Sequence, residues 1–466
     1  MIPSSSPELA PAPAGDAEAP ESPLTAEAED EGSEGSCWRR HWFPVAYLRD
    51  LDRRRPQPFT LLGEDLVLWW DRQGEVWQAF RDVCPHRLVP LSQGRINDAG
   101  ELECPYHGWT FAGDGRCTAI PQAEPGATPS ERRSHCRRHA TAEAQGLLFV
   151  FAGDPEAASA VPLPIVPLLE EGNWLVQDTF RDLPMDALTL LENVLDVSHV
   201  PFTHHRTVGR RENAAPVQAE LTGFGPEGFT AIWPEGPRRG RLGSQFTTFA
   251  APGLMWHDLT AKGFARILTV VYAVPIRRGE CRLFARFPFR FESRLPALLL
   301  RLRPLWLQHI GNHTVLEDDQ VFLHWQERVL EQRGRSGSAA RAFHLATTAD
   351  VYVKALHDWV MAYQGDPFPA EPLPPRRELA ALMDRHDSHT RHCRSCRDAL
   401  ARIRFSRSWL PALPWLALLA LVVWPAPAVL FAVLVVALIT ALTHRQLGRW
   451  EHQLLSGDGH PPRNRN

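Results

Sequence analysis

The stretch that decides the fold begins with Cys84-Pro-His86 and is completed, after residues 87–103, by Cys104-Pro-Tyr-His107-Gly-Trp109. Each of these short segments offers one thiolate and one imidazole, at the spacings C-x-H and C-x2-H. A proline follows each cysteine and restricts the backbone there. The sequence therefore predicts two matched loops that together present four potential metal ligands.

Two cysteines and two histidines in this order can hold a [2Fe–2S] cluster, with both cysteines on one iron and both histidines on the other, which is the Rieske pattern. The alternative is a Cys2His2 zinc site, which uses the same ligand types. Zinc fingers usually keep like ligands together, whereas each loop here mixes them. The pattern therefore favours a Rieske cluster, which carries single electrons, ligated by Cys84, His86, Cys104 and His107.

The segments around these loops have the composition of β-strands. Apolar runs occur at 66–70, 76–80 and 147–151, with turn residues between them. We therefore expect a small antiparallel β domain over residues 37–155. Residues 1–36 are rich in Pro, Ala, Ser and Glu and contain no Lys or Arg, so we expect a disordered acidic tail rather than a signal or transit peptide.

Composition limits the remaining possibilities. A chain of 466 residues has room for two or three domains. A net charge of −4 gives no basic footprint for nucleic acid, so no nucleic-acid partner is expected. Eight cysteines, scattered except for Cys393 and Cys396, make no disulfide framework and indicate a reducing interior. The character of the N-terminal tail favours a bacterial cytoplasmic setting over import into an organelle.

A second group of potential ligands lies downstream of the two loops. Asn193, Asp196 and His199 are spaced by three, so a helix would align them on one face. Pro201 then bends the chain, which lets His204 return beside His199. Two neighbouring histidines and a carboxylate form the facial triad of non-haem Fe(II), which leaves positions open for O2 and substrate.

The carboxylate is expected from three consecutive acids. We choose Asp319, while Asp318 and Glu317 compete with it, because spacing alone cannot separate adjacent residues. A histidine pair by itself is more often hydrogen-bonded than metal-bound. The upstream cluster favours the metal, since a one-electron carrier needs an acceptor. We interpret His205 and His313 as ordinary histidines.

Rieske loops followed by D-x2-H-x4-H resemble the Rieske non-haem iron oxygenases. Within them, segments 84–96, 106–109 and 192–204 are similar to the pheophorbide a oxygenase-like branch, which includes the chlorophyllide a oxygenases, and suggest a cyanobacterial type. The resemblance implies an α+β chain. In it, the antiparallel β Rieske domain is followed by a helix-grip (START-like) catalytic domain over residues 160–400.

The resemblance also implies a path for electrons and a substrate. In the family's homotrimers the cluster of one subunit lies near the iron of the next, and Asp196 would bridge ligand histidines of both centres. A carboxylate one helical turn before His199 is also well placed to hydrogen-bond that ligand. We expect reduced ferredoxin as electron donor, O2, and a chlorophyll-derived tetrapyrrole resembling pheophorbide a or chlorophyllide a. The alternatives are an oxygenase for another apolar aromatic, and a membrane-bound redox sensor or electron carrier without turnover.

Cys393 and Cys396 form a C-x2-C pair beside three histidines, His386, His389 and His392. Such a pair can cycle between dithiol and disulfide, bind zinc together with histidine, or be inert. The resembling family carries a C-x2-C here that looks like a thioredoxin-responsive switch. Redox regulation, with thioredoxin as a partner, is therefore the favoured interpretation.

Residues 409–443 contain no charged side chain, and this run exceeds the about twenty residues of one membrane span. Trp424-Pro-Ala-Pro427 interrupts it, which predicts helices at about 410–424 and 428–443. We expect a transmembrane hairpin over 408–444 and a polar tail over 445–466, with a wedge in one leaflet as the alternative. Arginines flank both ends, which places them and the catalytic domains on the cytoplasmic side of a cyanobacterial thylakoid or plasma membrane.

Overall fold

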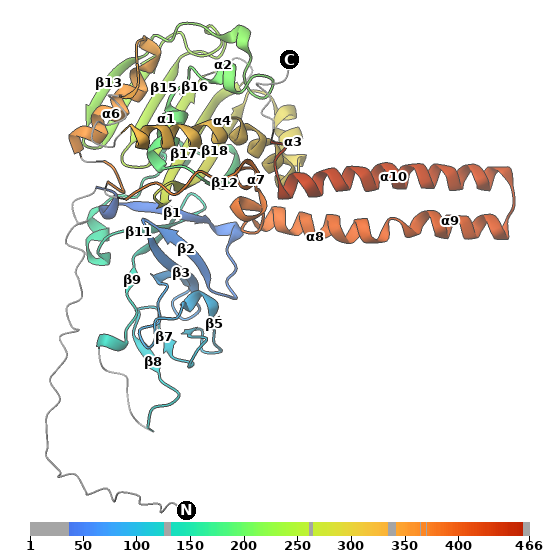
Figure 1. Cartoon of the computed structure of the whole chain (residues 1–466), viewed down its shortest axis with the longest axis horizontal. Coiled ribbons are helices and arrows are strands. Elements are labelled where there is room, and N and C mark those ends of the chain that lie inside the picture. The colour runs from blue at the N-terminus through green and yellow to red at the C-terminus, as the bar shows by residue number, and fades with distance from the viewer. Residues whose placement is uncertain are drawn as a thin grey trace, which may run out of the picture. The chain divides into compact units, whose positions relative to one another are not determined.

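Short antiparallel strands build the N-terminal part of the computed structural model (Figure 1). The structure describes residues 37–124, 132–260, 264–333, 342–363, 365–369 and 371–459, so the acidic tail expected at 1–36 lies outside the described residues. Two sheets form the body of this part. Their orders are β2-β3-β4-β9, with Gln57–Leu61, Glu64–Asp71, Val76–Arg81 and Arg138–His139, and β1-β11-β10, with Trp42–Tyr47, Leu147–Phe151 and Thr141–Ala144.

A third small sheet carries the ligand loops. Its order is β5-β6-β7-β8, with Arg95–Ile96, Leu102–Glu103, Thr110–Phe111 and Cys117–Ala119. Cys84 and Cys104 belong to a separate hydrophobic core with Trp69, Phe80 and Phe111. The strands expected at 66–70, 76–80 and 147–151 are present as β3, β4 and β11, so their apolar runs were sufficient to predict them.

The second part is one seven-stranded antiparallel sheet. Its order is β12-β18-β17-β16-β15-β14-β13, with Leu175–Leu183, Glu280–Phe291, Phe264–Arg277, Leu254–Leu259, Gln245–Ala250, Gly228–Trp233 and Glu220–Gly225. Strands β13 to β18 follow one another as a meander, and β12 joins the edge beside β18. Three helices cover the sheet (Figure 1): α1 (Ala187–Leu195) on β17 and β18, α4 (Leu305–Gln332) on β12, and α6 (Val351–Tyr363) on β13 and β14. The expected α+β helix-grip architecture is confirmed.

Helix α4 has an unusual buried face. Most buried helix faces are apolar, because burying a polar group without a partner is unfavourable. The buried residues of α4 are mostly titratable or polar: Gln308, His309, His313, Glu317, Asp318, Asp319, Gln320, His324 and Glu327. A face of this kind needs partners that satisfy its charges along the length of the helix, from Gln308 to Glu327.

The C-terminal helices form an antiparallel pair (Figure 1). Helix α10 (Pro427–Leu455) runs beside α8 (Arg394–Trp409) and α9 (Ala412–Val423). Stretches 394–423 and 427–455 are long and apolar enough to cross a membrane, by length and composition. Their large apolar side chains are exposed, unlike those of a core helix: Trp415, Leu416, Leu419, Val422, Phe431, Leu434 and Leu438. The helices expected at 410–424 and 428–443 are thus present, and α10 continues into the segment expected as a polar tail.

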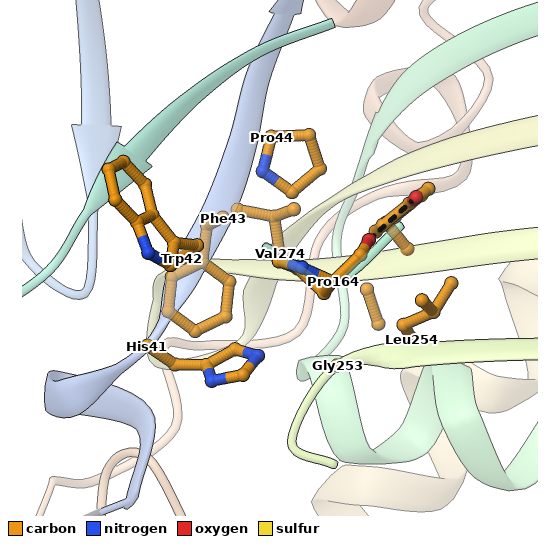
Figure 2. Close-up of a pocket in the computed structure, with 10 residues that line it drawn as sticks. His41, Trp42, Phe43, Pro44, Pro164, Gly253, Leu254 and Val274 are labelled. Atoms are coloured by element: carbon orange, nitrogen blue, oxygen red, sulfur yellow. Dashed lines mark hydrogen bonds between the residues drawn. The ribbon is translucent and has the colours of Figure 1, made fainter. Parts of the chain in front are cut away.

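Strand β1 packs against the seven-stranded sheet. The hydroxyl of Tyr47 lies 3.2 Å from the carbonyl oxygens of Thr179 and Ala285. Figure 2 shows a pocket at the start of β1, lined by His41 and residues of β1 together with Pro164, Gly253, Leu254 and β17. Its volume is about 10 Å³. A cavity of this size holds at most one water molecule, so it is too small for an organic substrate.

Candidate metal centres

The two ligand loops have the same backbone turn despite their different spacing. The N–H of Leu88 donates to the carbonyl of Cys84 at 2.9 Å, and the N–H of Gly108 donates to that of Cys104 at 3.2 Å. Leu88 and Gly108 have φ values of 58° and 72°, in the left-handed region. This turn folds each loop back over its own cysteine, so that the two loops face one another.

The four residues expected to hold the cluster meet between these turns. Cys84 and Cys104 are buried, and the ring centroids of His86 and His107 lie 4.6 Å apart. His86 also stacks on Trp109, with the ring planes 7° apart. Nδ1 of both histidines is buried and lacks a hydrogen-bond partner among the described residues. Two free imidazole nitrogens beside two thiols are the donor set that a Rieske [2Fe–2S] cluster requires.

Burial also affects how readily the Cys84 thiol ionises. Burial raises the pKa of Cys84 to about 11, and the neighbouring Cys104 thiol adds to this effect. Metal ligation requires the thiolate, which the protein environment alone disfavours at neutral pH. A bound cluster would supply the positive charge that the buried thiolates need.

The second site differs locally from its expected helix. Helix α1 ends at Leu195, so Asn193, Asp196 and His199 do not share a helical face, and the predicted alignment is wrong. The physical reason is a local turn: the Asp196 carboxylate accepts hydrogen bonds from the backbone N–H and the hydroxyl of Ser198, at 2.7 and 2.6 Å. Such side-chain bonds to the backbone compete with helix formation.

A new short helix brings the two histidines together. Helix α2 (Val200–Thr203) starts directly after His199, with Pro201 in its first turn, where the absent N–H costs nothing. His199 and His204 then flank one helical turn, and their Nε2 atoms lie 3.3 Å apart. Pro201 therefore has the expected effect, although it starts a helix rather than bending one.

Asp319 of α4 completes the group. Its carboxylate oxygens lie 3.2 Å from Nε2 of His204 and 4.0 Å from Nε2 of His199. The ligand atoms of these three residues all lie within 4.8 Å of one another. Asp319 Oδ1 is buried and has no hydrogen bond within the described part of the chain. Two imidazoles and one carboxylate would occupy one face of a metal ion placed between them, which is the facial triad that leaves other positions open.

The three consecutive acids of α4 have different partners, because successive helical residues are rotated by about 100°. Asp319 faces both histidines, whereas Asp318 Oδ2 lies 3.2 Å from Nδ1 of His204, on the opposite edge of that ring. Glu317 forms buried ion pairs, at 2.7 and 2.6 Å, with Arg181 and Arg385. The fold thus separates residues that spacing left equivalent.

The site is strongly negative. Burial lowers the pKa of His204, but hydrogen bonds to Asp318 and Asp319 outweigh burial and raise that pKa to about 9. Asp196 Oδ2 lies 3.5 Å from Nδ1 of His199. Burial raises the pKa of Asp196, yet the hydrogen bond with His199 holds it below its usual value. Carboxylates on the outer edges of both rings favour a cation at the inner edges.

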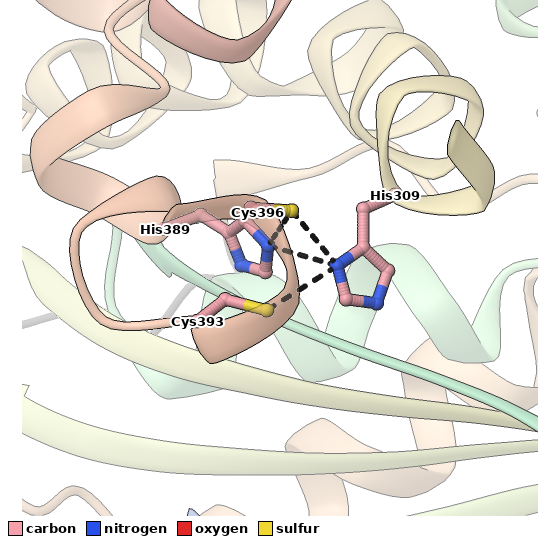
Figure 3. Close-up of side chains that lie close together, drawn as sticks. All are labelled: His309, His389, Cys393 and Cys396. Carbon is pink, nitrogen blue, oxygen red and sulfur yellow. Dashed lines mark hydrogen bonds between the residues drawn. The ribbon is translucent and has the colours of Figure 1, made fainter. Parts of the chain in front are cut away.

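Of the three histidines next to the C-x2-C pair, only His389 faces the cysteines. His386 contacts Asp387, and His392 accepts a hydrogen bond from its neighbour Arg391. A fourth histidine, which sequence analysis missed, joins them instead: His309 of α4 lies beside both cysteines (Figure 3). No local signal could have found His309, because it is 84 residues from Cys393 and only the fold brings the two together.

Comparisons with known proteins agree with this architecture. A family model described as the Rieske [2Fe-2S] domain matches residues 41–139, and one described as pheophorbide a oxygenase matches residues 249–337. The NdmA protein of Pseudomonas putida CBB5, solved with caffeine, superposes with a TM-score of 0.56 at 20% identity, over 73% of this chain and 98% of that protein. This likeness shows a common fold.

Curated relatives give the family. The chloroplastic pheophorbide a oxygenase of Arabidopsis thaliana is 36% identical over 71% of this chain, and that of Oryza sativa subsp. japonica is 33% identical over 73%. The chain spans 65% and 67% of their lengths. The chloroplastic flavonoid 8-hydroxylase 2 of Ocimum basilicum is 28% identical over 91% of this chain and 85% of its own length. The chain belongs to the Rieske non-haem iron oxygenases, in the branch of pheophorbide a oxygenase and its relatives.

Proposed function

We propose that this chain is an oxygenase that uses O2 and electrons from reduced ferredoxin to oxygenate a hydrophobic, chlorophyll-derived tetrapyrrole. The observation that carries the proposal is the presence of two different ligand sets. A pure electron carrier or redox sensor needs the Cys/His loops but has no use for the group of His199, His204 and Asp319. The substrate class rests on the similarity to the two plant pheophorbide a oxygenases.

The proposed roles follow from the donor sets. Cys84, His86, Cys104 and His107 hold the [2Fe–2S] cluster, and His199, His204 and Asp319 hold the mononuclear iron. When bound, the cluster supplies single electrons and the iron binds and activates O2.

The surrounding residues orient these ligands. Asp318 accepts a hydrogen bond from Nδ1–H of His204, which directs Nε2 of that ring at the metal position, where a bound metal would displace the Nε2 proton. The Thr207 hydroxyl donates to the same Asp318 oxygen at 3.0 Å and fixes the carboxylate.

Asp196 is proposed to link the centres of neighbouring subunits in a homotrimer. One carboxylate oxygen faces His199 while the other is held by Ser198, and 27% of the side chain remains exposed. At the cluster loops, the apolar side chains of Leu88 and Tyr106 are 74% and 57% exposed beside the ligand histidines. Exposed apolar groups beside a redox centre support a surface that a neighbouring subunit covers.

We propose that the C-terminal hairpin anchors the enzyme in a membrane, with both ends on the cytoplasmic side. The charge-free stretch 409–423, which includes α9, would be about 22 Å long as a continuous helix, and the charge-free part of α10, residues 427–443, is about 25 Å long, at about 1.5 Å per residue. Both are shorter than the roughly 30 Å hydrocarbon core. The flanking turns of the same helices extend each arm enough to cross the bilayer, which would place the enzyme near an apolar substrate dissolved in the lipid.

A second candidate function is the hydroxylation of a flavonoid. The match to flavonoid 8-hydroxylase 2 covers 91% of this chain, compared with 71% and 73% for the two pheophorbide a oxygenases. Tetrapyrroles and flavonoids are both apolar and aromatic, and the ligand sets fit either substrate equally. Product formation from each substrate therefore decides between the two candidate functions.

The test uses the full-length protein in lipid nanodiscs, with reduced ferredoxin and 18O2. Pheophorbide a, chlorophyllide a and a flavonoid are supplied in parallel, and product and O2 uptake are measured. We expect a tetrapyrrole product that contains oxygen from O2, and no such product from His199→Ala protein whose cluster spectrum is intact. Flavonoid product alone would transfer the assignment to the second candidate, and a His199→Ala protein that still forms product would refute the site.

A further inference from the structure

We propose that His309, His389, Cys393 and Cys396 form a third metal site, which binds one structural Zn²⁺ (Figure 3). The four residues come from separate elements: His309 from α4, His389 from the π-helical turn His386–Thr390, and the cysteines from the start of α8. All four are 0–1% exposed. Two thiolates and two imidazoles in a closed, buried group are the usual ligands of a structural zinc ion.

The ligand atoms lie close to the spacing of a tetrahedral site, all within 4.8 Å of one another. Nδ1 of His309 lies 3.0 Å from Nε2 of His389, 3.3 Å from Sγ of Cys396 and 3.6 Å from Sγ of Cys393. Nε2 of His389 lies 3.3 Å from Sγ of Cys396. A tetrahedral zinc ion, with Zn–N about 2.0–2.1 Å and Zn–S about 2.3 Å, places its ligand atoms roughly 3.3–3.8 Å apart. Small inward or outward shifts of the side chains therefore suffice for binding.

Hydrogen bonds at the outer nitrogens of both imidazoles determine which nitrogens carry protons. Nδ1–H of His389 donates to the carbonyl of Phe180 at 2.7 Å, and Nε2–H of His309 donates to the carbonyl of Asp178 at 2.8 Å. Carbonyl oxygens only accept, so these two ring nitrogens are the protonated ones. The inner nitrogens then face one another as lone pairs at 3.0 Å, which is repulsive unless a cation lies between them. A backbone carbonyl on the outer nitrogen is also the usual arrangement for a metal-bound histidine.

A thiol–disulfide switch, expected from the sequence, competes for the same sulfurs. Both cysteines are 0% exposed, so a reductase reaches them only after the start of α8 has opened. A simple dithiol also has no need of two imidazoles aimed at its sulfurs. The zinc assignment accounts for all four side chains, whereas the switch accounts for two.

The position of the site indicates what zinc would do. It joins α4 to the edge strand β12 and to the first turn of α8, where the hairpin begins. The backbone N–H of Arg394 also donates to Asp50 in the N-terminal part, at 2.8 Å. On α4, the iron-site residue Asp319 lies ten positions after His309, about 15 Å along the axis. Zinc would therefore stop α4 from sliding along the sheet, and so fix the position of Asp319 relative to the two histidines of the iron site.

Metal analysis of the intact protein is the first test. Full-length protein purified under anaerobic conditions should contain about one zinc in addition to about three irons per chain. His309→Gln and Cys396→Ser should lose the zinc and keep the irons, with a melting temperature lower by roughly 10 °C. Cys281→Ser is the matched control: Cys281 is equally buried, in β18, and lies outside the group, so zinc content should not change.

X-ray absorption at the zinc edge of the wild-type protein gives a result even if the variants fail to fold. The expected shell has two sulfurs at about 2.3 Å and two nitrogens at about 2.0–2.1 Å. Zinc-free wild-type protein with a Cys393–Cys396 disulfide, detected by peptide mass, would overturn the proposal in favour of the switch. A fourth iron in place of zinc, or zinc bound only through surface histidines, would also overturn it.

Discussion

The chain contains two groups of two cysteines and two histidines, and they are built in opposite ways. In the first, Cys84, His86, Cys104 and His107 lie on adjacent loops, and both histidines are only partly buried. In the second, His309 comes from a helix far upstream of Cys393, and every ligand is buried. An electron carrier must present its histidine edge to a partner, whereas a structural ion works best when it is closed off. The same four residue types would thus serve different purposes through their different exposure.

The largest effect separates the two groups by function. Cys104→Ser should remove the visible and paramagnetic signature of the Rieske cluster and lower turnover by more than about 10³-fold, because the cluster loses a ligand. The zinc content should stay at about one per chain. Metal analysis and electron paramagnetic resonance check both statements. Cys117→Ser, at a buried cysteine of the same core that lies outside the ligand set, is the control and should keep the cluster; loss of zinc together with the cluster would contradict two independent sites.

Asp196→Asn should have the next largest effect. The amide keeps the size of the side chain but removes the charge that faces Nδ1 of His199. Because partners on the outer edge of a ligand commonly affect activity by 10–100-fold, we expect turnover to fall by about 100-fold while both iron sites stay loaded. Stopped-flow oxidation of the pre-reduced cluster, with substrate and O2, measures the step directly. The exposed Asp387→Asn is the control, and an unchanged rate in Asp196→Asn would exclude Asp196 from the electron path.

These two predictions rest on residues that the sequence already identified, which shows how far local patterns reach. The Cys/His loops, β3, β4, β11 and the two apolar helices were predictable because each depends on neighbouring residues only. Asp319 could be placed within three residues but not chosen, since the rotation of α4 against the sheet decides which acid faces His204. His309 was beyond reach, because its contact with Cys393 exists only after β12 and α8 have packed on α4. The helix expected through His199 failed because Asp196 bonds to Ser198 instead.

Asp318→Asn tests whether the iron site, like the zinc group, depends on the outer partner of a histidine. The Asp318 carboxylate contacts Nδ1 of His204, whereas in the zinc group the outer ring nitrogens donate to backbone carbonyls. Loss of the charge should weaken iron binding by about 10-fold or more, with zinc unchanged. Iron content after dialysis against a graded chelator series measures this. Equal iron retention in the variant and wild type would show that the orientation of His204 is set by other contacts.

The smallest expected effect concerns the two turns that make the exposed site possible. Leu88 and Gly108 hold the same left-handed position, but only glycine does so without steric cost, which is about 1–2 kcal/mol for other residues. Leu88 is exposed, so Leu88→Gly removes strain with little loss of packing and should raise the stability of the cluster domain by about 1 kcal/mol. Gly108→Ala should lower it by a similar amount, because a methyl group there would also lie 3.2 Å from Pro121. Urea unfolding followed by cluster absorbance measures both. The gain from Leu88→Gly is expected for dissociated subunits, in which Leu88 is exposed. In the assembled trimer the same substitution should lower stability, because the neighbouring subunit would cover the leucine, and a gain in both states would contradict the proposed trimer surface.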